Sequence, residues 1–181
     1  SEEERRVTAY HEAGHALVAR ALPHTDPVHK ITIMPRGRAL GYTMVLPDDD
    51  RYSTTRNQLL DQLAYSLGGR AAEELIFHDP STGASNDIEK ATALARAMVT
   101  QYGMTESIGA IKLGSDTSAP FMGRDYGHQR DYSENLAAVV DREVRSLIEN
   151  AHQEAFDILV ANRVILDEMV LELLERETLN K

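Results

Sequence analysis

An apolar repeat with helical spacing runs through residues 1–22 and carries the stretch HEAGH at positions 11–15. Ser1 and Glu4 have the S-x-x-E form of a capping box, which is typical of a helix start. The positions that share the apolar spacing are Val7, Tyr10, Gly14, Leu17, Val18 and Ala21. The pattern predicts a helix to about Leu22, and residues four apart on it share one face. His11 and His15 must therefore point the same way.

The stretch HEAGH fits the pattern H-E-x-x-H, whose spacing suits a metal. Two imidazoles on one helical face can bind a single Zn²⁺, and Glu12 is then offset by one position, beside the water on that metal. The alternative is a pair of surface histidines. We favour the metal site, because two histidines and a glutamate on an apolar helix need a shared partner when buried. Glu12 is the candidate catalytic base.

Composition restricts which ligands and partners are possible. The 181 residues contain no cysteine, so disulfides, zinc ribbons and iron-sulfur clusters are excluded and any metal must use His, Asp or Glu. A formal net charge of −10 disfavours binding to nucleic acid or to anionic lipid. No apolar run is long enough to span a bilayer, and the start SEEERR does not resemble a signal peptide. We expect one soluble domain over residues 1–181.

A catalytic zinc site needs a third protein ligand. The metzincin continuation requires Gly and His at positions 18 and 21, but the chain has Val18 and Ala21 there. The remaining acidic and histidine candidates are Glu73, Glu74, His78, Asp79 and Asp87. Spacing alone does not choose among them, since Asp87 in a first helical turn could simply complement the helix dipole.

Other candidate roles are weaker. Glu73 and Glu74 form either a solvated pair at a helix end or, for Glu73, a partner that orients a ligating histidine. The isolated histidines are predicted to lie on the surface or in loops; they are His24, His29, His78, His128 and His152.

Two β segments are predicted at 30–34 and 39–46, separated by a turn at 35–38. Within the second, Leu40, Gly41 and Tyr42 are candidates for contact with an extended substrate, because a peptide can add to a sheet edge and a glycine permits close backbone approach. The compatible alternative is an ordinary strand whose residues Leu40, Tyr42 and Met44 face the core.

The rest of the chain is predicted to be helical. Thr55 and Gln58 can cap a helix with an apolar stripe over 59–75, and Gly68-Gly69 inside it indicates close packing. A helix over 88–102 is expected to have Ser85 as its N-cap and to stop at Gly103. We predict a catalytic part at 1–115, an exposed loop at 116–130, and a C-terminal helical hairpin at 131–181. The expected fold is mainly α with a small β-hairpin or sheet, in which a zincin-type H-E-x-x-H helix is followed by a helical bundle.

Four stretches, HEAGH, PRGRALGYTM, LGGRAAEEL and STGASNDIEKAT, occur in this order. Together they closely resemble the peptidase domain of the FtsH family, membrane-anchored ATP-dependent zinc metalloproteases. Carried over residue by residue, the resemblance implies that His11, His15 and Asp87 are zinc ligands and that Glu12 is the catalytic base. It covers nearly the whole chain and is weakest in the 114–130 loop and the C-terminal helices.

The resemblance also implies properties of a longer protein. These are one Zn²⁺ per subunit, an N-terminal membrane anchor and an ATPase module that are both missing from this chain, and ATP use only through that module. Unfolded or membrane proteins would be the substrates, in a homo-oligomeric ring, most simply a hexamer. The expected location is the cytoplasmic face of the membrane or the equivalent organelle compartment. A non-catalytic, metal-stabilised interaction module is the alternative function.

Overall fold

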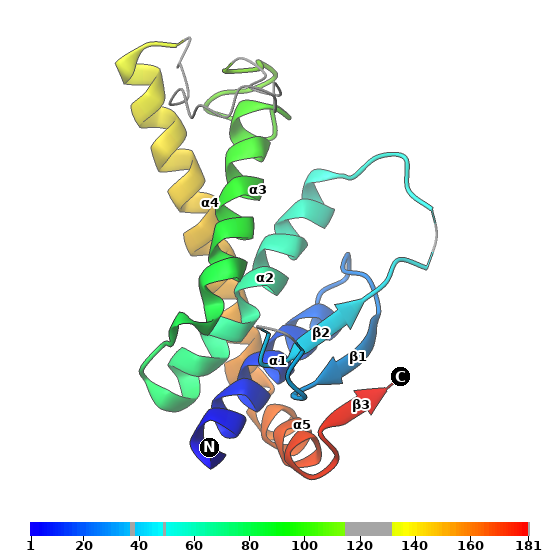
Figure 1. The fold of residues 1–181 in the computed structure, drawn as a ribbon. Helices are drawn as coiled ribbons and strands as arrows, with labels where there is room; N and C mark the ends of the chain where they lie inside the picture. Colours follow the sequence, from blue (N-terminus) through cyan, green and yellow to red (C-terminus); the bar gives the residue numbers. More distant parts are fainter. Residues whose placement is uncertain (37–38, 49, 115–131, 181) are drawn as a thin grey trace.

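The computed structural model describes residues 1–36, 39–48, 50–114 and 132–180. In these ranges, helices make up most of the molecule and a small antiparallel sheet lies beside them (Figure 1). The helices are α1 (Glu2–Ala21), α2 (Arg56–Phe77), α3 (Ser85–Thr100), α4 (Glu134–Ala161) and α5 (Arg163–Arg176), with a 3-10 turn at Thr82–Ala84. The strands are β1 (Val28–Thr32), β2 (Tyr42–Val45) and β3 (Thr178–Asn180). The predicted mainly-α fold with a small sheet is confirmed.

Helix α1 lies at the centre of the molecule. It begins with the predicted capping box of Ser1 and Glu4. Every residue from Ala9 to Ala19 is buried, because α2, α4, α5 and the sheet all contact this helix. A helix surrounded in this way has no solvent-facing side for polar groups, so His11, Glu12 and His15 must find partners inside the protein.

Helix α2 crosses α1 at three glycines. A Cβ atom on Gly14 would lie 2.5 Å from the carbonyl oxygen of Gly68, and one on Gly68 would lie 2.9 Å from the carbonyl oxygen of Gly14. The close packing predicted at Gly68-Gly69 is confirmed. The predicted capping box of Thr55 and Gln58 is also present.

The sheet has the strand order β2-β1-β3, so β2 is an edge strand. Both pairings are antiparallel, and Thr43 on β2 lies opposite Ile31 on β1. Leu40 is 60% and Met44 37% exposed. The alternative in which these side chains face the core is therefore wrong. Side chains alternate along a strand, and here it is the opposite face, with Thr43, that contacts α1.

One expectation about a helix start needs correction. Ser85 is the first residue of α3 rather than its N-cap, because the 3-10 turn directly precedes the helix and places Ala84 at the cap position. Helices α4 and α5 follow one another with only Asn162 between them, and α5 packs mainly against α1 and to a smaller extent against α4. Strand β3, which brings the chain end to β1, was not expected.

The loop predicted at 116–130 lies outside the described residues, and so does His128. In the part of the chain that the structure describes, no helix combines the length and hydrophobicity that crossing a bilayer requires.

Candidate metal centre

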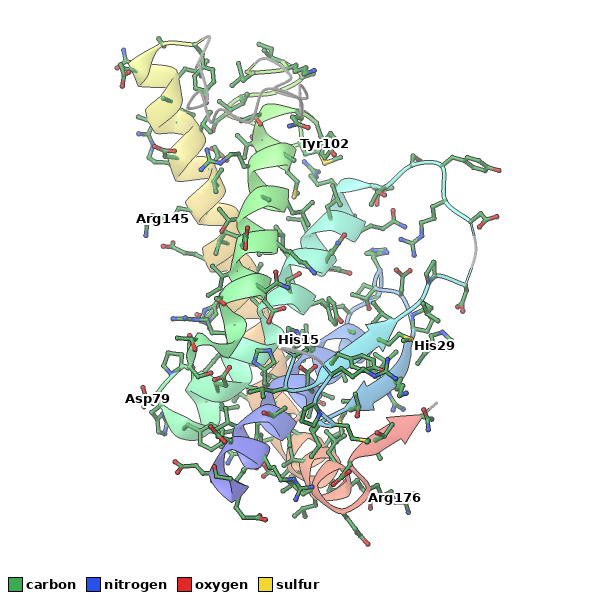
Figure 2. The ribbon with its side chains drawn as sticks, in the orientation of Figure 1. His15, His29, Asp79, Tyr102, Arg145 and Arg176 are labelled. Atoms are coloured by element: carbon green, nitrogen blue, oxygen red, sulfur yellow. The ribbon has the colours of Figure 1, made fainter. Side chains whose placement is uncertain are left out.

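The side chains of His11, His15 and Asp87 converge where α1, α2 and α3 meet. His11 Nε2 and His15 Nε2 are 3.1 Å apart, and each lies 3.1 Å from Asp87 Oδ2. Figure 2 shows His15 in the interior of the molecule, whereas Asp79 lies at its outer edge. Among the described residues, this is the group of three potential ligands close enough to share one metal ion.

One side-chain acceptor and one backbone acceptor fix the orientation of the two imidazoles. His11 Nδ1–H donates to Glu73 Oε2 at 2.7 Å, and His15 Nδ1–H donates to the carbonyl oxygen of Tyr65 at 2.8 Å. Glu73 is itself held, because its Oε1 accepts the backbone N–H of Ser81 at 3.0 Å. With Nδ1 protonated in both rings, each Nε2 presents a lone pair to the common point.

The donor atoms fit a zinc ion. Lone pairs on two nitrogens and one carboxylate oxygen face one another across 3.1 Å, and a single proton could satisfy only one of the contacts. A cation at the centre satisfies all three. Ligands ~2.0 Å from a tetrahedral Zn²⁺ stand about 3.3 Å apart, close to the separations seen here. Two imidazoles and a carboxylate leave the fourth position of such a site open, as in catalytic zinc sites.

Gly69 provides the space in which the two rings lie. A Cβ atom on Gly69 would come within 2.5 Å of His11 Nε2 and 2.6 Å of His15 Nε2. Any other residue at this position would fill the volume beside both ligand nitrogens. The second glycine of the Gly68-Gly69 pair thus makes room for the candidate ligands as well as for helix packing.

The electrostatics of the metal-free chain reflect this crowding. Burial opposes a charge on His11, but hydrogen bonds to Asp87 and Glu73 and the charge of Glu12 outweigh it and raise the pKa of His11 to about 10. For Asp87, burial is likewise outweighed, and hydrogen bonds with His11 and His15 hold its pKa well below the usual range. Burial, followed by the charges of Glu12 and Asp87, raises the pKa of the Tyr65 phenol. Without a metal, a proton on His11 is therefore favoured, and a metal ion that binds Nε2 must displace it.

Glu12 is buried beside the cluster without joining it. Its Oε2 accepts a hydrogen bond of 2.8 Å from the hydroxyl of Thr43 on β2, and it is not one of the three grouped ligand residues. A carboxylate next to the metal position but outside the ligand set is what a general base requires.

The remaining candidates lie elsewhere. Glu74 accepts from Arg70 Nε at 2.7 Å and lies 2.9 Å from His152 Nε2, so it binds away from the centre, and His152 is not isolated. His78 and Asp79 are exposed after α2. Of the proposed substrate-contact residues, Leu40 is exposed and Gly41 lies against Glu12, with a Cβ position 3.2 Å from Glu12 Cγ. Tyr42 is partly buried.

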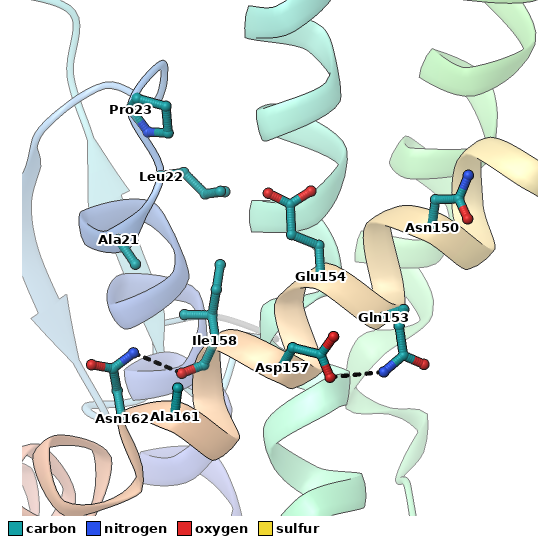
Figure 3. Close-up of a pocket in the computed structure, with 10 residues that line it drawn as sticks. All are labelled: Ala21, Leu22, Pro23, Asn150, Gln153, Glu154, Asp157, Ile158, Ala161 and Asn162. Carbon is teal, nitrogen blue, oxygen red and sulfur yellow. Dashed lines mark hydrogen bonds between the residues drawn. The ribbon is translucent and has the colours of Figure 1, made fainter.

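A groove of about 670 Å³ lies between the end of α1 and α4 (Figure 3). Its lining includes Leu22, Pro23 and Ile158 with the carboxylates of Glu154 and Asp157. None of the metal-centre residues contributes to it, so the groove is separate from the metal centre.

Sequence reasoning missed several contributors to the centre. The carbonyl of Tyr65 and the N–H of Ser81 are backbone groups, which leave no signal in residue identity. Thr43 is an ordinary strand residue, and only the fold brings it to Glu12. Gly69 was recognisable as a glycine inside a predicted helix, which indicated close packing. The sequence did not show that His11 and His15 are the residues that pack against it.

An H-E-x-x-H helix whose imidazoles meet a carboxylate from a distant helix defines the zincin class of metal-dependent peptidase. Within that class the chain belongs to peptidase family M41, whose model matches residues 1–181. The resemblance deduced from the four sequence stretches is thereby confirmed.

Several relatives that share one name match the chain over all or nearly all of its length. It is 67% identical over its full length to "ATP-dependent zinc metalloprotease FtsH" of Cutibacterium acnes (strain SK137), of which it spans 25%. It is 54% identical over 99% of its length to the protein of that name from Rubrobacter xylanophilus, spanning 28% of it. The protein of that name from Mycobacterium leprae (strain TN) is 50% identical over the whole chain, which covers 23% of it. The chain thus spans about a quarter of the length of these curated relatives.

Proposed function

We propose that this chain is a zinc-dependent endopeptidase domain. The observation that carries the proposal is the convergence of His11, His15 and Asp87 on one point, with the unligated carboxylate of Glu12 beside them on the same helix. Membership of peptidase family M41 and the printed name of the relatives support it. His11, His15 and Asp87 are the proposed ligands of one Zn²⁺, and Glu73 orients His11.

When bound, a zinc ion supplies a Lewis acid that polarises the scissile carbonyl and lowers the pKa of water. Glu12 takes the proton that the attacking water loses as its oxygen bonds to the carbonyl carbon. Glu12 then gives this proton to the peptide nitrogen as the C–N bond breaks, so the carboxylate returns to its starting state. His11 and His15 keep their Nε2 lone pairs aimed inward throughout, because Glu73 and the Tyr65 carbonyl hold their Nδ1 protons.

Strand β2 is the proposed docking edge for substrate. It pairs with β1 on one side only, as the end strand of the sheet, so an extended peptide can add to its free side through main-chain hydrogen bonds. Gly41 lies against Glu12, which would place a peptide along Leu40, Gly41 and Tyr42 next to the base. Such binding selects extended, unfolded chains.

For the full-length protein we propose an ATP-dependent protease in which this domain follows a membrane anchor and an ATPase module. ATP would act only through that module. The subunits would form a hexameric ring at the cytoplasmic face of the membrane, or its organelle equivalent, and degrade unfolded or membrane proteins. Two observations support a separate ATPase module. The relatives' name contains the words "ATP-dependent", and this chain spans only about a quarter of their length.

The test combines metal content with cleavage of an unfolded substrate such as casein. We expect one zinc per chain and cleavage that o-phenanthroline abolishes, that its non-chelating isomer m-phenanthroline leaves intact, and that added zinc restores. Zinc bound in the same amount without any cleavage would favour the alternative, a metal-stabilised interaction module. Glu12 argues against that alternative, because a purely structural site has no use for an unligated carboxylate.

A further inference from the structure

The carboxylate of Glu12 has one partner whose role the peptidase chemistry does not yet explain. The hydroxyl of Thr43, on β2, lies 2.8 Å from Glu12 Oε2 and 3.0 Å from the backbone carbonyl oxygen of Glu12. A threonine hydroxyl has one proton. That proton is therefore shared between the carboxylate and the backbone carbonyl of Glu12. Both groups of Glu12 are thus held by the same hydroxyl on β2.

The sheet makes this contact rigid. Threonine is branched at Cβ, so few rotamers are open to it, and Thr43 is fixed in register opposite the buried Ile31. Gly41, the residue directly before β2, lies close to the side chain of Glu12, since a Cβ there would lie 3.2 Å from Glu12 Cγ. Glu12 is thus bounded at its stem by Gly41 and at its head by Thr43.

We propose that Thr43 is a positioning residue for the reaction: its hydroxyl holds Oε2 of Glu12 so that Oε1 is the oxygen that exchanges a proton with water. The inference rests on the proposed peptidase function. It also gives β2 a second task, because the strand proposed to dock the peptide would at the same time orient the base. The same strand would then hold both the peptide and Glu12, which favours correct orientation of the reacting atoms.

Removing the hydroxyl should affect turnover more than binding. Thr43→Val keeps the branched shape and the strand preference but loses the donor, whereas Thr43→Ser keeps the donor. A hydrogen bond to a charged group is worth enough to change a rate by about 10- to 100-fold. We therefore expect Thr43→Val to lower kcat by about that factor with KM little changed, and Thr43→Ser to stay close to the wild type. Zinc content should be equal in all three.

A second measurement does not depend on turnover. A peptide hydroxamate chelates zinc and presents its hydroxyl to the neighbouring carboxylate, so its affinity reports where that carboxylate lies. Thr43→Val should weaken hydroxamate binding by about 10-fold or more, and should have no further effect in a Glu12→Gln background, because the two residues act as one unit. Thr100→Val is the matched control: its buried hydroxyl donates to the carbonyl of Arg96 at 2.8 Å, at the far end of α3.

The outcomes separate the two proposals. A wild-type chain that binds neither zinc nor hydroxamate overturns the proposed function and this inference together. A wild type that binds both, with Thr43→Val indistinguishable from it or from Thr100→Val, overturns the role of Thr43 alone. Loss of zinc in Thr43→Val, or failure of Thr43→Ser to restore kcat and affinity, would make Thr43 a structural residue and equally overturn the inference.

Discussion

His11 shows how its neighbours fix the orientation of a proposed metal ligand. Its Nδ1 lies 2.7 Å from Glu73 and its Nε2 3.1 Å from Asp87, so one nitrogen is occupied by a fixed acceptor and the other faces the shared point. Asp87 lies in the first turn of α3, where an acid would complement the helix dipole in any case. Its 3.1 Å distances to both imidazoles support the proposed role of Asp87 as the third ligand.

The two carboxylates should respond differently to mutation. Asp87→Ala leaves only two histidines and should abolish tight zinc binding. Glu73→Gln keeps the side-chain shape but replaces one of the two accepting oxygens with an NH2 donor, so it should weaken zinc binding by about 10- to 100-fold. Zinc affinities measured by competition with a chelating dye check this order, with the exposed Asp79→Ala as control. The reverse order would make Glu73 the third ligand.

The pH dependence of the metal-free chain follows from the same contacts. The pKa of His11 is raised from its ordinary 6.5 to about 10, so its contribution to stability is complete below pH 6.5 and is lost as the pH rises through about 10. The pKa values of Glu73 and Asp87 are lowered, so their contributions are present above their ordinary values and lost in acid.

In EDTA, the urea midpoint should therefore fall between about pH 6 and about pH 9. With zinc the trend should reverse, because metal binding needs unprotonated imidazoles. Asp87→Asn, which removes one charge that raises the pKa of His11, should show a smaller fall in EDTA. An EDTA curve that rises with pH for the wild type would contradict the ion-pair account of the cluster.

At the scale of elements, the crossing of α1 and α2 sets the metal centre. Glycine inside a helix costs ~1 kcal/mol relative to alanine, so Gly69→Ala would stabilise an isolated helix. Here the added methyl would lie 2.5 Å from His11 Nε2. We expect Gly69→Ala to retain the fold, shown by circular dichroism, but to lose most zinc affinity.

Gly68→Ala is the informative comparison. Its methyl would meet the backbone oxygen of Gly14 at 2.9 Å and the side chain of Val18 at 3.1 Å, so α1 and α2 must move apart. Its melting temperature should fall even in EDTA, where zinc plays no part. Equal zinc affinity in Gly69→Ala and wild type would show that the rings do not need this space.

What could be predicted from the sequence was mainly local. The capping boxes at Ser1 and Thr55 marked helix starts correctly because cap and helix are neighbours in the chain. Spacing alone placed His11 and His15 on one face of a helix, but it left the third ligand open, because Asp87 meets them only through the packing of α3. The contact of Thr43 with Glu12 and the pairing of β3 with β1 depend equally on tertiary structure.

At the scale of the whole molecule, α1 is enclosed while parts of the C-terminal helices are not. Large apolar side chains are exposed on α4 and α5, namely Val160, Val164, Ile165 and Leu171. Exposed apolar surface suits contact with a further subunit, but the net charge of −10 on each chain opposes it.

Self-association of the chain should therefore strengthen as salt screens this repulsion. Sedimentation velocity at low and moderate ionic strength measures it, with Val164→Asp as the variant that should dissociate the assembly. A monomer at every protein and salt concentration would mean that the contacts of the proposed ring lie in the rest of the full-length protein.

Glu12 is the proposed base at the zinc centre, and the variant Glu12→Gln tests this role. Glu12→Gln keeps a side-chain carbonyl that Thr43 can hydrogen-bond, so the fold should be retained, but an amide can neither take the proton of water nor deliver it to the leaving amine. Zinc content and casein cleavage are measured on the same sample. We expect full zinc occupancy, with hydrolysis reduced by about 10²-fold or more. Substantial hydrolysis by the variant would contradict the role of Glu12 as base, and loss of zinc would make Glu12 part of the ligand set instead.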